Sequence, residues 1–316
     1  MATLTAIATH DALTYRRMGI RRAVLSRHAN LGDCWTSRDV LQRLLSGRFA
    51  RRSSSAYPIG RGPSAAQLAV AVSRRVLQDL PGLTADEVGS VIYCHTAIDQ
   101  TLSDSTAGRL QFDLGLPRAN PFSISQSHNA GLLVGLDIAL GLVDGPEANA
   151  NVLLVASDKL LYGGPSDDSR ALMFGDVAAA AMVSREARPG WQVDDVRVRQ
   201  FDTPCSAYAA WPAGDVKAFA EFGAEVVGAA LRDTGLAPLD LAAVVTTTPD
   251  AALVAALHRA ARLGRPRAPA REARASSPDL LIALASLQAS VARNAPVLAW
   301  SAGNNGEFAC GVLTKV

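Results

Sequence analysis

The feature that most constrains the fold is an internal repeat, because the two parts of the chain present the same kinds of segment in the same order. Each part has an amphipathic helix, a Gly-Leu turn, a short β-branched strand, a Gly-x-Pro-Arg-Ala tract, a polar stretch, an apolar helix and an apolar strand. The first part runs through AAQLAVAVSRRVLQDL, GLTADEVGSVIYCHTA, DLGLPRANPFSISQSHNAGLLVGLDIALGLV and NVLLVAS, and the second through FAEFGAEVVGAALRDT, GLAPLDLAAVVTTTPDA, ARLGRPRAPAREARASSPDLLIALASLQASV and APVLAWSAG. So many ordered matches are hard to obtain by chance. The sequence therefore predicts two related α/β halves, at residues 1–185 and 186–316.

The hydrophobic patterns place these segments in layers. Short, uniformly apolar strands such as VLLVAS are typical of sheets that are buried on both faces. The helices LLVGLDIALGLV and LLIALASLQASV are apolar nearly all round, as expected of helices buried between two layers. In contrast, His258 lies in the helical stretch ALVAALHRAARL, where we expect it to be exposed.

A polar stretch, Ser125 to Asn129, stands where a strand should pass into the first central helix. We call this connection the elbow. The N-terminus of a buried helix offers free backbone N–H groups and the positive end of a dipole, which suit a nucleophile or a developing anion. The elbow is therefore the predicted functional site, and Asn129 is a candidate N-cap of the helix or a ligand contact.

These segments resemble the thiolase superfamily, and within it the β-ketoacyl-acyl-carrier-protein synthase III proteins, including their relatives in secondary metabolism. The pieces that carry the resemblance are ISQSHNAGLLVGL, NVLLVASDKL, ALMFGDVAAAAMV and SAGNNGEFACGVL. The resemblance implies a thiolase-like αβαβα layered α/β fold made of two duplicated halves. It also implies an acyl thioester, from coenzyme A or a phosphopantetheine-linked acyl carrier protein, as ligand or substrate, with no metal or other cofactor.

The resemblance further implies a cysteine at the elbow that takes up the acyl group, assisted by a histidine and an asparagine or second histidine from the second half. In this sequence the cysteine position is Asn129. The histidine position falls at Pro249, which is followed by Asp250, and the third position falls at or next to Arg274. None of the three expected residues is present, so we expect cysteine-dependent condensation to be lost.

The loop that corresponds to the family's glycine-rich oxyanion loop is also altered. Gly303 and Gly306 remain as candidate backbone donors, but Glu307 follows them. A carboxylate that points into this loop would disfavour an oxyanion.

Three further residues near the elbow are candidates for the pocket. Ser127 and His128 are adjacent, but neighbours in an extended segment point to opposite faces, so local hydrogen bonding is favoured over a catalytic pair. Cys94 stands before a histidine at the end of a predicted strand. A buried, structural thiol is the favoured interpretation there.

Three functions remain open from the sequence. In the first, a degenerate synthase III-like protein binds acyl thioesters in fatty-acid-like or secondary-metabolite biosynthesis. In the second, an active acyltransferase or decarboxylase uses residues other than the family's. In the third, the chain is a non-catalytic partner or scaffold subunit of an active synthase, and basic segments at residues 16–22 and 47–52 recognise an acidic carrier protein.

Bulk properties agree with these classes. A formal net charge of +2 gives no case for nucleic acid, and no apolar run is long enough for a membrane span. The four cysteines are far apart, which argues against a zinc site and against disulfides and favours a reducing cytoplasm. By resemblance we expect a homodimer, or a heterodimer with an active homologue, because the strand VLLVAS and the helix before it should leave an apolar surface exposed in a monomer.

Overall fold

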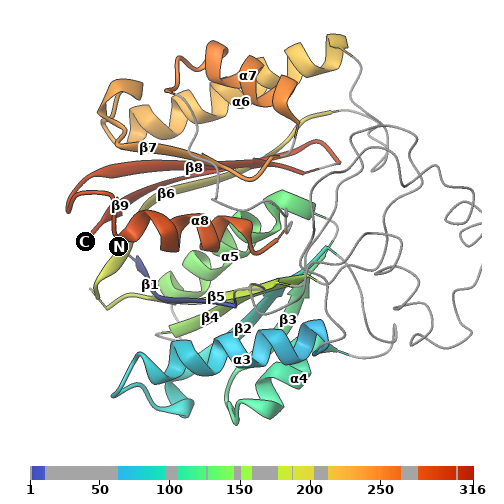
Figure 1. Ribbon diagram of the computed structural model, residues 1–316, viewed down its shortest axis with the longest axis vertical. Helices are drawn as coiled ribbons and strands as arrows, with labels where there is room; N and C mark the ends of the chain where they lie inside the picture. Colours follow the sequence, from blue (N-terminus) through green and yellow to red (C-terminus); the bar gives the residue numbers. More distant parts are fainter. Residues whose placement is uncertain are drawn as a thin grey trace, which may run out of the picture.

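The computed structural model describes most of the chain. The described residues are 2–10, 63–96, 105–125, 127–145, 151–158, 177–186, 188–202, 213–248, 250–264, 277–303 and 305–316. They form five layers, in which helices and sheet alternate from the bottom to the top of the molecule (Figure 1). The predicted layered α/β fold is confirmed.

The first half supplies the lower layers and one helix of the middle layer (Figure 1). Its elements are β1 (Ala2–His10), α3 (Ala65–Gln78), β2 (Val88–Cys94), α4 (Thr106–Asp113), β3 (Asn120–Ile124), α5 (Gly131–Asp144), β4 (Asn151–Asp158) and β5 (Val177–Ser184). The side chain of Ser64 caps α3 and forms a capping box with Gln67, which explains why the helix begins there.

The second half repeats this order in the upper layers. Its elements are β6 (Gly190–Gln200), α6 (Ala213–Asp233), β7 (Ala243–Thr246), α7 (Ala251–Ala260), α8 (Asp279–Gln288), β8 (Pro296–Ala302) and β9 (Glu307–Lys315). The predicted helices and apolar strands correspond to these elements, with ends that differ by a few residues.

The strand pairings show the same repetition. The nine strands form one sheet in the order β3-β2-β4-β5-β1-β6-β9-β8-β7. In the first half β2 pairs in parallel with β3 and β4, and β5 is antiparallel to β4 and β1. In the second half β7 and β8 are parallel, and β9 is antiparallel to β8 and β6. The two parts meet where β1 and β6 pair in antiparallel register, with Thr3 opposite Gln192.

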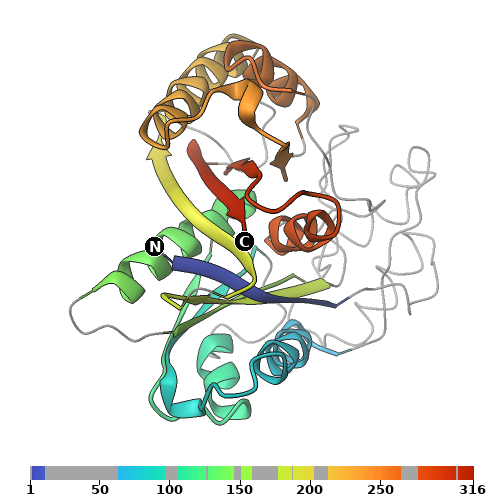
Figure 2. The same cartoon turned by 90° about the vertical axis from the view of Figure 1, so that its left-hand side faces the viewer.

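Two central helices lie between the two parts of this sheet. The second view shows the sheet turning at β1 and β6, so that its parts lie on opposite sides of α5 and α8 (Figure 2). One core cluster combines residues of both helices, including Leu133, Leu136, Leu281 and Leu284, with strand residues from both halves. The first polar stretch therefore leads into a buried helix, as predicted, and α8 is also buried. Most of the polar stretch that precedes α8 lies outside the described residues.

The strand next to α5 in the chain does not have the exposure that we expected. β4 lies between β2 and β5, and every one of its residues is buried. The expectation that VLLVAS leaves an apolar surface open in a monomer is therefore wrong, because its own sheet and helices cover it. The strand at the first-half edge is β3, whose residues are partly or fully exposed.

A second correction concerns His258, which is buried in α7 instead of exposed. Its Nδ1 lies 2.6 Å from the carbonyl oxygen of Gly264, and its Nε2 accepts a hydrogen bond of 3.2 Å from the indole of Trp300. These contacts fix a neutral ring with the proton on Nδ1. Burial lowers the pKa of His258, which agrees with that state.

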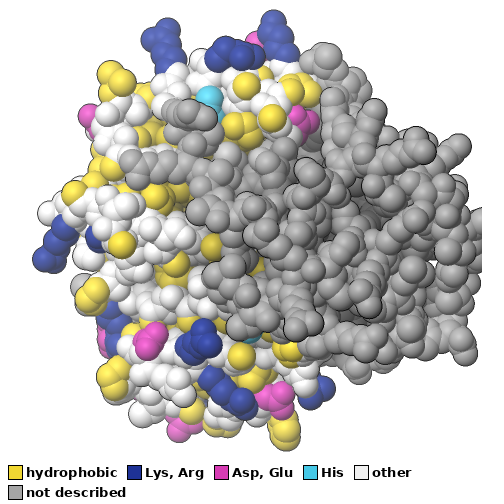
Figure 3. All heavy atoms as spheres, viewed as in Figure 1, with side chains coloured by type: hydrophobic (Ala, Val, Ile, Leu, Met, Phe, Trp, Pro, Cys, Tyr) yellow, Lys and Arg dark blue, Asp and Glu magenta, His cyan; other side chains and the backbone are white. Residues whose placement is uncertain are grey.

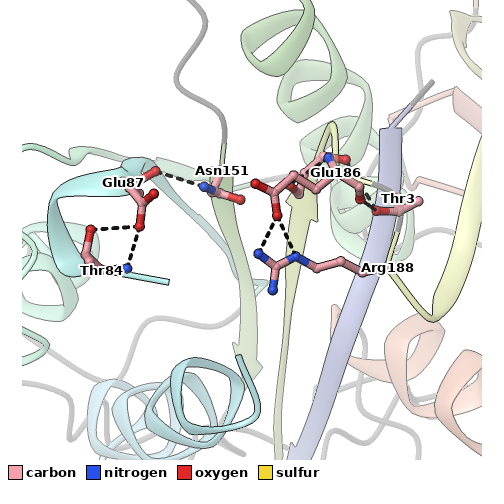
Figure 4. Close-up of polar contacts among 7 residues, drawn as sticks. Thr3, Thr84, Glu87, Asn151, Glu186 and Arg188 are labelled. Carbon is pink, nitrogen blue, oxygen red and sulfur yellow. Dashed lines mark hydrogen bonds and ion pairs between the residues drawn. The ribbon is translucent and has the colours of Figure 1, made fainter. Parts of the chain in front are cut away.

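Polar contacts connect the ends of neighbouring strands where β1, β2 and β4 begin (Figure 4). The amide of Asn151 donates to the carbonyl of Glu87 at 3.1 Å, and the Glu87 carboxylate accepts from Thr84. At the end of β5, the hydroxyl of Thr3 donates to the carbonyl of Glu186 at 2.6 Å. The elbow lies at the other end of these parallel strands, where β2, β3 and β4 end.

Charged side chains lie mainly over the outer helices on the face shown in Figure 3. On α4, Arg109 pairs with Asp113 at 3.3 Å, so basic and acidic groups are mixed there. Within the described ranges, no helix combines the length and the hydropathy that a membrane span requires.

Candidate functional site

The elbow runs from the end of β3 to the start of α5. Residues His128–Ala130 form a single 3₁₀ turn, and α5 follows at Gly131. Asn129 is buried in this turn, with 5% of its surface exposed. It therefore lies at the N-terminal end of a central helix, but the N-cap position of α5 belongs to Ala130, and the expectation that Asn129 caps the helix is wrong.

His128 has an unusual backbone conformation within the elbow. Its φ of 46° is left-handed, which is uncommon for a residue other than glycine and costs of order 1 kcal/mol or more. Its Nδ1 is buried with no hydrogen-bond partner among the described residues. Burial lowers the pKa of the ring, so the histidine is held neutral.

The hydroxyl of Ser127 has a partner that is distant in sequence. It donates a hydrogen bond of 3.0 Å to Oε1 of Glu307, which lies at the start of β9. The prediction that this hydroxyl makes a local hydrogen bond is therefore wrong. The hydroxyl has a single proton, which it donates to Glu307 and not to His128. The two halves of the chain meet at this pair.

Gly303 makes room for the Glu307 carboxyl. A Cβ at this glycine would lie 2.3 Å from Oε2 of Glu307 and 3.0 Å from the carbonyl oxygen of Ser127. The Gly303 N–H donates to the carbonyl of Glu307 at 2.8 Å, which closes the turn between β8 and β9. This N–H, a candidate oxyanion donor, is thus already used. Gly306 lies in the same turn, and its carbonyl accepts from Phe201.

The environment of Glu307 perturbs its carboxyl. Burial raises the pKa of Glu307, while the hydrogen bond from Ser127 lowers it to a smaller extent. Its Oε2 is buried and has no hydrogen-bond partner among the described residues. An unsatisfied buried acceptor costs about 1–3 kcal/mol, so a hydrogen-bond donor at this oxygen would be favourable.

The cysteines of the described residues are packed in the core. The thiol of Cys94 donates to the carbonyl of Gly131 at 3.4 Å, and a Cβ at Gly135 would lie 2.8 Å from its sulfur. Burial, and secondarily the charge of Asp158, raise the pKa of Cys94 far above its usual range. Burial also raises the pKa of Cys310 to about 12. Neither thiol forms a thiolate at neutral pH, so neither can be a nucleophile in this state.

Of the remaining candidates from the second half, the structure describes only Asp250. The carboxylate of Asp250 caps α7 by accepting from Ala252 and Leu253. Pro249 and Arg274 lie outside the described residues, as do the basic segments at 16–22 and 47–52.

One buried carboxylate near the second central helix was not predicted. Asp158, at the end of β4, accepts from the backbone N–H of Thr96 at 2.7 Å and of Ser277 at 2.9 Å. It thus joins the first half to the segment that leads into α8. An acidic residue directly after an apolar strand was the available signal, since such a position lies at the edge where a parallel sheet carries its site.

Known proteins match the chain locally in sequence and wholly in fold. The family model for 3-oxoacyl-[acyl-carrier-protein] synthase III matches residues 125–200, which include the elbow. A β-ketoacyl-[acyl-carrier-protein] synthase III of Chlamydia caviae is 36% identical over 110 residues, 34% of this chain and 32% of that protein. Another, of Sodalis glossinidius, is 29% identical over 174 residues, 53% of this chain and 49% of that protein. The chain thus spans half or less of the length of these curated relatives.

A solved structure of a 3-oxoacyl-[acyl-carrier-protein] synthase III from Aquifex aeolicus superposes with a TM-score of 0.74. The superposition covers 99% of this chain and 100% of the other, at 16% sequence identity, so it establishes the fold. The family-model match, which includes the elbow, and the whole-chain fold agree with each other. This chain has the fold of a 3-oxoacyl-[acyl-carrier-protein] synthase III and resembles that family in sequence over residues 125–200.

Proposed function

We propose that this chain binds acyl thioesters of coenzyme A or acyl carrier protein at the elbow, and that it does not carry the acyl group as a thioester of its own. The curated relatives are named for their action with an acyl carrier protein, which supports this ligand class. The observation that carries the proposal is that the elbow holds an amide and not a thiol. An amide, Asn129, occupies the buried turn before α5, and the nearest described thiol, Cys94, is sealed behind that helix.

The chemistry follows from these groups. A carboxamide is not a nucleophile under physiological conditions, so Asn129 cannot displace coenzyme A from a thioester. The Glu307 carboxyl beside Ser127 supplies no hydrogen bond to an oxyanion when it is ionised. The ordinary condensation reaction therefore lacks its nucleophile and its charge-stabilising environment.

The test combines binding with a search for covalent adducts. Binding is measured by titration calorimetry with a thioether analogue of octanoyl-coenzyme A, in which no acyl transfer can occur. Adducts are sought by intact-mass spectrometry after exposure to acetyl-, octanoyl- and malonyl-coenzyme A. We expect saturable binding and an unchanged protein mass. A stable acyl adduct would contradict the second half of the proposal, and an absence of binding to the analogue would contradict the first.

The assembly and the pathway are part of the same proposal. We expect the protein to work as a homodimer, or as a heterodimer with an active homologue, in fatty-acid-like or secondary-metabolite biosynthesis. The partly exposed strand β3 supports the assembly, since it lies at the edge of the sheet among the described residues and an edge strand can pair with another strand.

A further inference from the structure

The Glu307 carboxyl is a titratable group in hydrogen-bond contact with the elbow. Its Oε1 is engaged by the Ser127 hydroxyl at 3.0 Å, and its Oε2 is buried and unpartnered among the described residues. Glu307 as a whole is half-buried, although its Oε2 is fully buried. The two oxygens thus have different roles, since one is fixed in place and the other is left to accept a proton or hydrogen bond.

The surrounding backbone preserves this arrangement. Only a glycine at position 303 leaves space for Oε2, because any Cβ there would overlap it. A hydrogen bond from the Gly303 N–H to the Glu307 carbonyl closes the turn between β8 and β9. This bond holds Glu307 at the elbow. A buried acceptor that is oriented on one side and unfilled on the other is suited to a donor carried by a ligand.

We propose that Glu307 is the general base for direct acyl transfer from a bound thioester to a hydroxyl or amine acceptor, and that Ser127 is the residue that positions it. This inference rests on the proposed function, because it needs an acyl thioester bound at the elbow. It assigns that thioester to a reaction for which no cysteine is required.

The step balances without an added reagent. The acceptor oxygen or nitrogen attacks the thioester carbonyl while its proton passes to Oε2 of Glu307. The tetrahedral intermediate then breaks its carbon–sulfur bond, and the leaving thiolate takes the proton back from Glu307. The products are an ester or amide and a free thiol, and the carboxylate is regenerated.

The electrostatics of the elbow favour this order of events over condensation. A permanent carboxylate would oppose an oxyanion, but here the carboxylate is neutralised by the acceptor's proton as negative charge develops on the carbonyl oxygen. Burial raises the pKa of Glu307, which makes it a stronger base than an exposed carboxylate while leaving it ionised above that pKa.

The test uses the full chain, octanoyl-coenzyme A and 2-aminoethanol, which offers both an amine and a hydroxyl. Release of free thiol is followed over the uncatalysed background, and the acylated acceptor is identified by mass spectrometry. We expect the parent to form product. Glu307→Gln keeps the side-chain shape, and we expect it to lower kcat by about 100-fold or more while KM and analogue binding stay near the parent's values. Glu221→Gln, on the outer helix α6, is the matched control and should behave as the parent.

The pH profile distinguishes a base from a structural residue. In the parent, kcat should rise with pH through the raised pKa of Glu307 and then level off. Ser127→Ala removes the hydrogen bond that lowers this pKa, so the rise should move to higher pH. A merely structural Ser127 would change the rate without moving the profile.

The possible outcomes separate this inference from the proposed function. If the analogue binds but the parent forms no product, or Glu307→Gln matches the parent, the base assignment is wrong and thioester binding stands. If the analogue does not bind, the proposed function itself fails. An acyl adduct on Ser127 would replace direct transfer with a covalent route and overturn the inference.

Discussion

Gly303 faces the Glu307 carboxyl so closely that an alanine there should separate the Ser127–Glu307 pair. The added Cβ would lie 2.3 Å from Oε2 and 3.0 Å from the backbone oxygen of Ser127, both shorter than relaxed contacts. The end of a flexible side chain moves more easily than a backbone carbonyl. Glu307 should therefore turn away, and its 3.0 Å hydrogen bond from Ser127 should break.

The size of the effect follows from three contributions. Loss of the hydrogen bond costs about 1 kcal/mol, and overpacking at a filled site costs about 1–3 kcal/mol. Replacing glycine by alanine returns about 0.4–1 kcal/mol, because the unfolded chain loses conformational freedom. We therefore expect Gly303→Ala to lower the free energy of unfolding by about 1–3 kcal/mol.

Urea denaturation measures this change, and the chain offers a matched control. Gly141 lies exposed on α5, where a Cβ would meet nothing within 4 Å. Gly141→Ala should leave the protein as stable as the parent or more stable by up to about 1 kcal/mol, from helix propensity. In the double variant Gly303→Ala/Glu307→Ala, Oε2 is absent, so the two effects should be less than additive by at least about 0.5 kcal/mol.

The reasoning is refuted if Gly303→Ala unfolds at the same urea concentration as the parent and the double variant is strictly additive. That result would mean that the carboxyl occupies a different place in solution. The assignment of Glu307 at the elbow would then lose its geometric basis.

Other predictions follow from the same contacts. Asn129→Cys should become acylated by octanoyl-coenzyme A, seen by intact mass, yet fail to condense with malonyl-carrier protein; a thiol that resists alkylation under native conditions would show that the position is sealed. Cys94 should resist iodoacetamide in the folded protein and react only on unfolding, because its pKa is raised by burial. His258 is held neutral, so stability should be fully present above about pH 6.5 and fall as the unfolded chain takes up a proton below it; urea midpoints should lose this dependence in His258→Gln. Sedimentation should show a dimer at micromolar concentration, and a monodisperse monomer would contradict the pairing of β3 edges.

The repetition of helices and strands in the two halves was predictable because hydrophobic periodicity and turn residues are local signals. The helices α3, α5, α6 and α8 and the strands β2, β4, β7 and β8 follow from them. β5 was not predicted as a strand, because its run Ala178–Ala181 has low strand propensity and the segment was noted only as a motif of the resemblance. The small side chains suit its position, because α3 packs on one face and α8 on the other.

The site was predictable in place but not in its contacts. The polar stretch before an apolar helix located the elbow, and the substitution at Asn129 was readable directly. The partner of Ser127 was not, since Glu307 is 180 residues away and only the fold brings it near. His258 was misjudged for the same reason, because helical position alone did not reveal that Trp300 would cover it. Long-range hydrogen bonds have no local signature.

The place of β1 in the sheet has a consequence for synthesis of the protein. This strand is synthesised before its partners β5 and β6, and Thr3 pairs with Ser184, which comes 181 residues later. At about 5–20 residues per second on the ribosome, the strand remains without its partners for about 9–36 s. During that time the nascent chain presents a partly apolar segment that can pair with any other exposed strand. Until β1 has paired with β5 and β6, newly made chains are thus exposed to misassembly, and a chaperone that shields residues 2–10 would act in that interval.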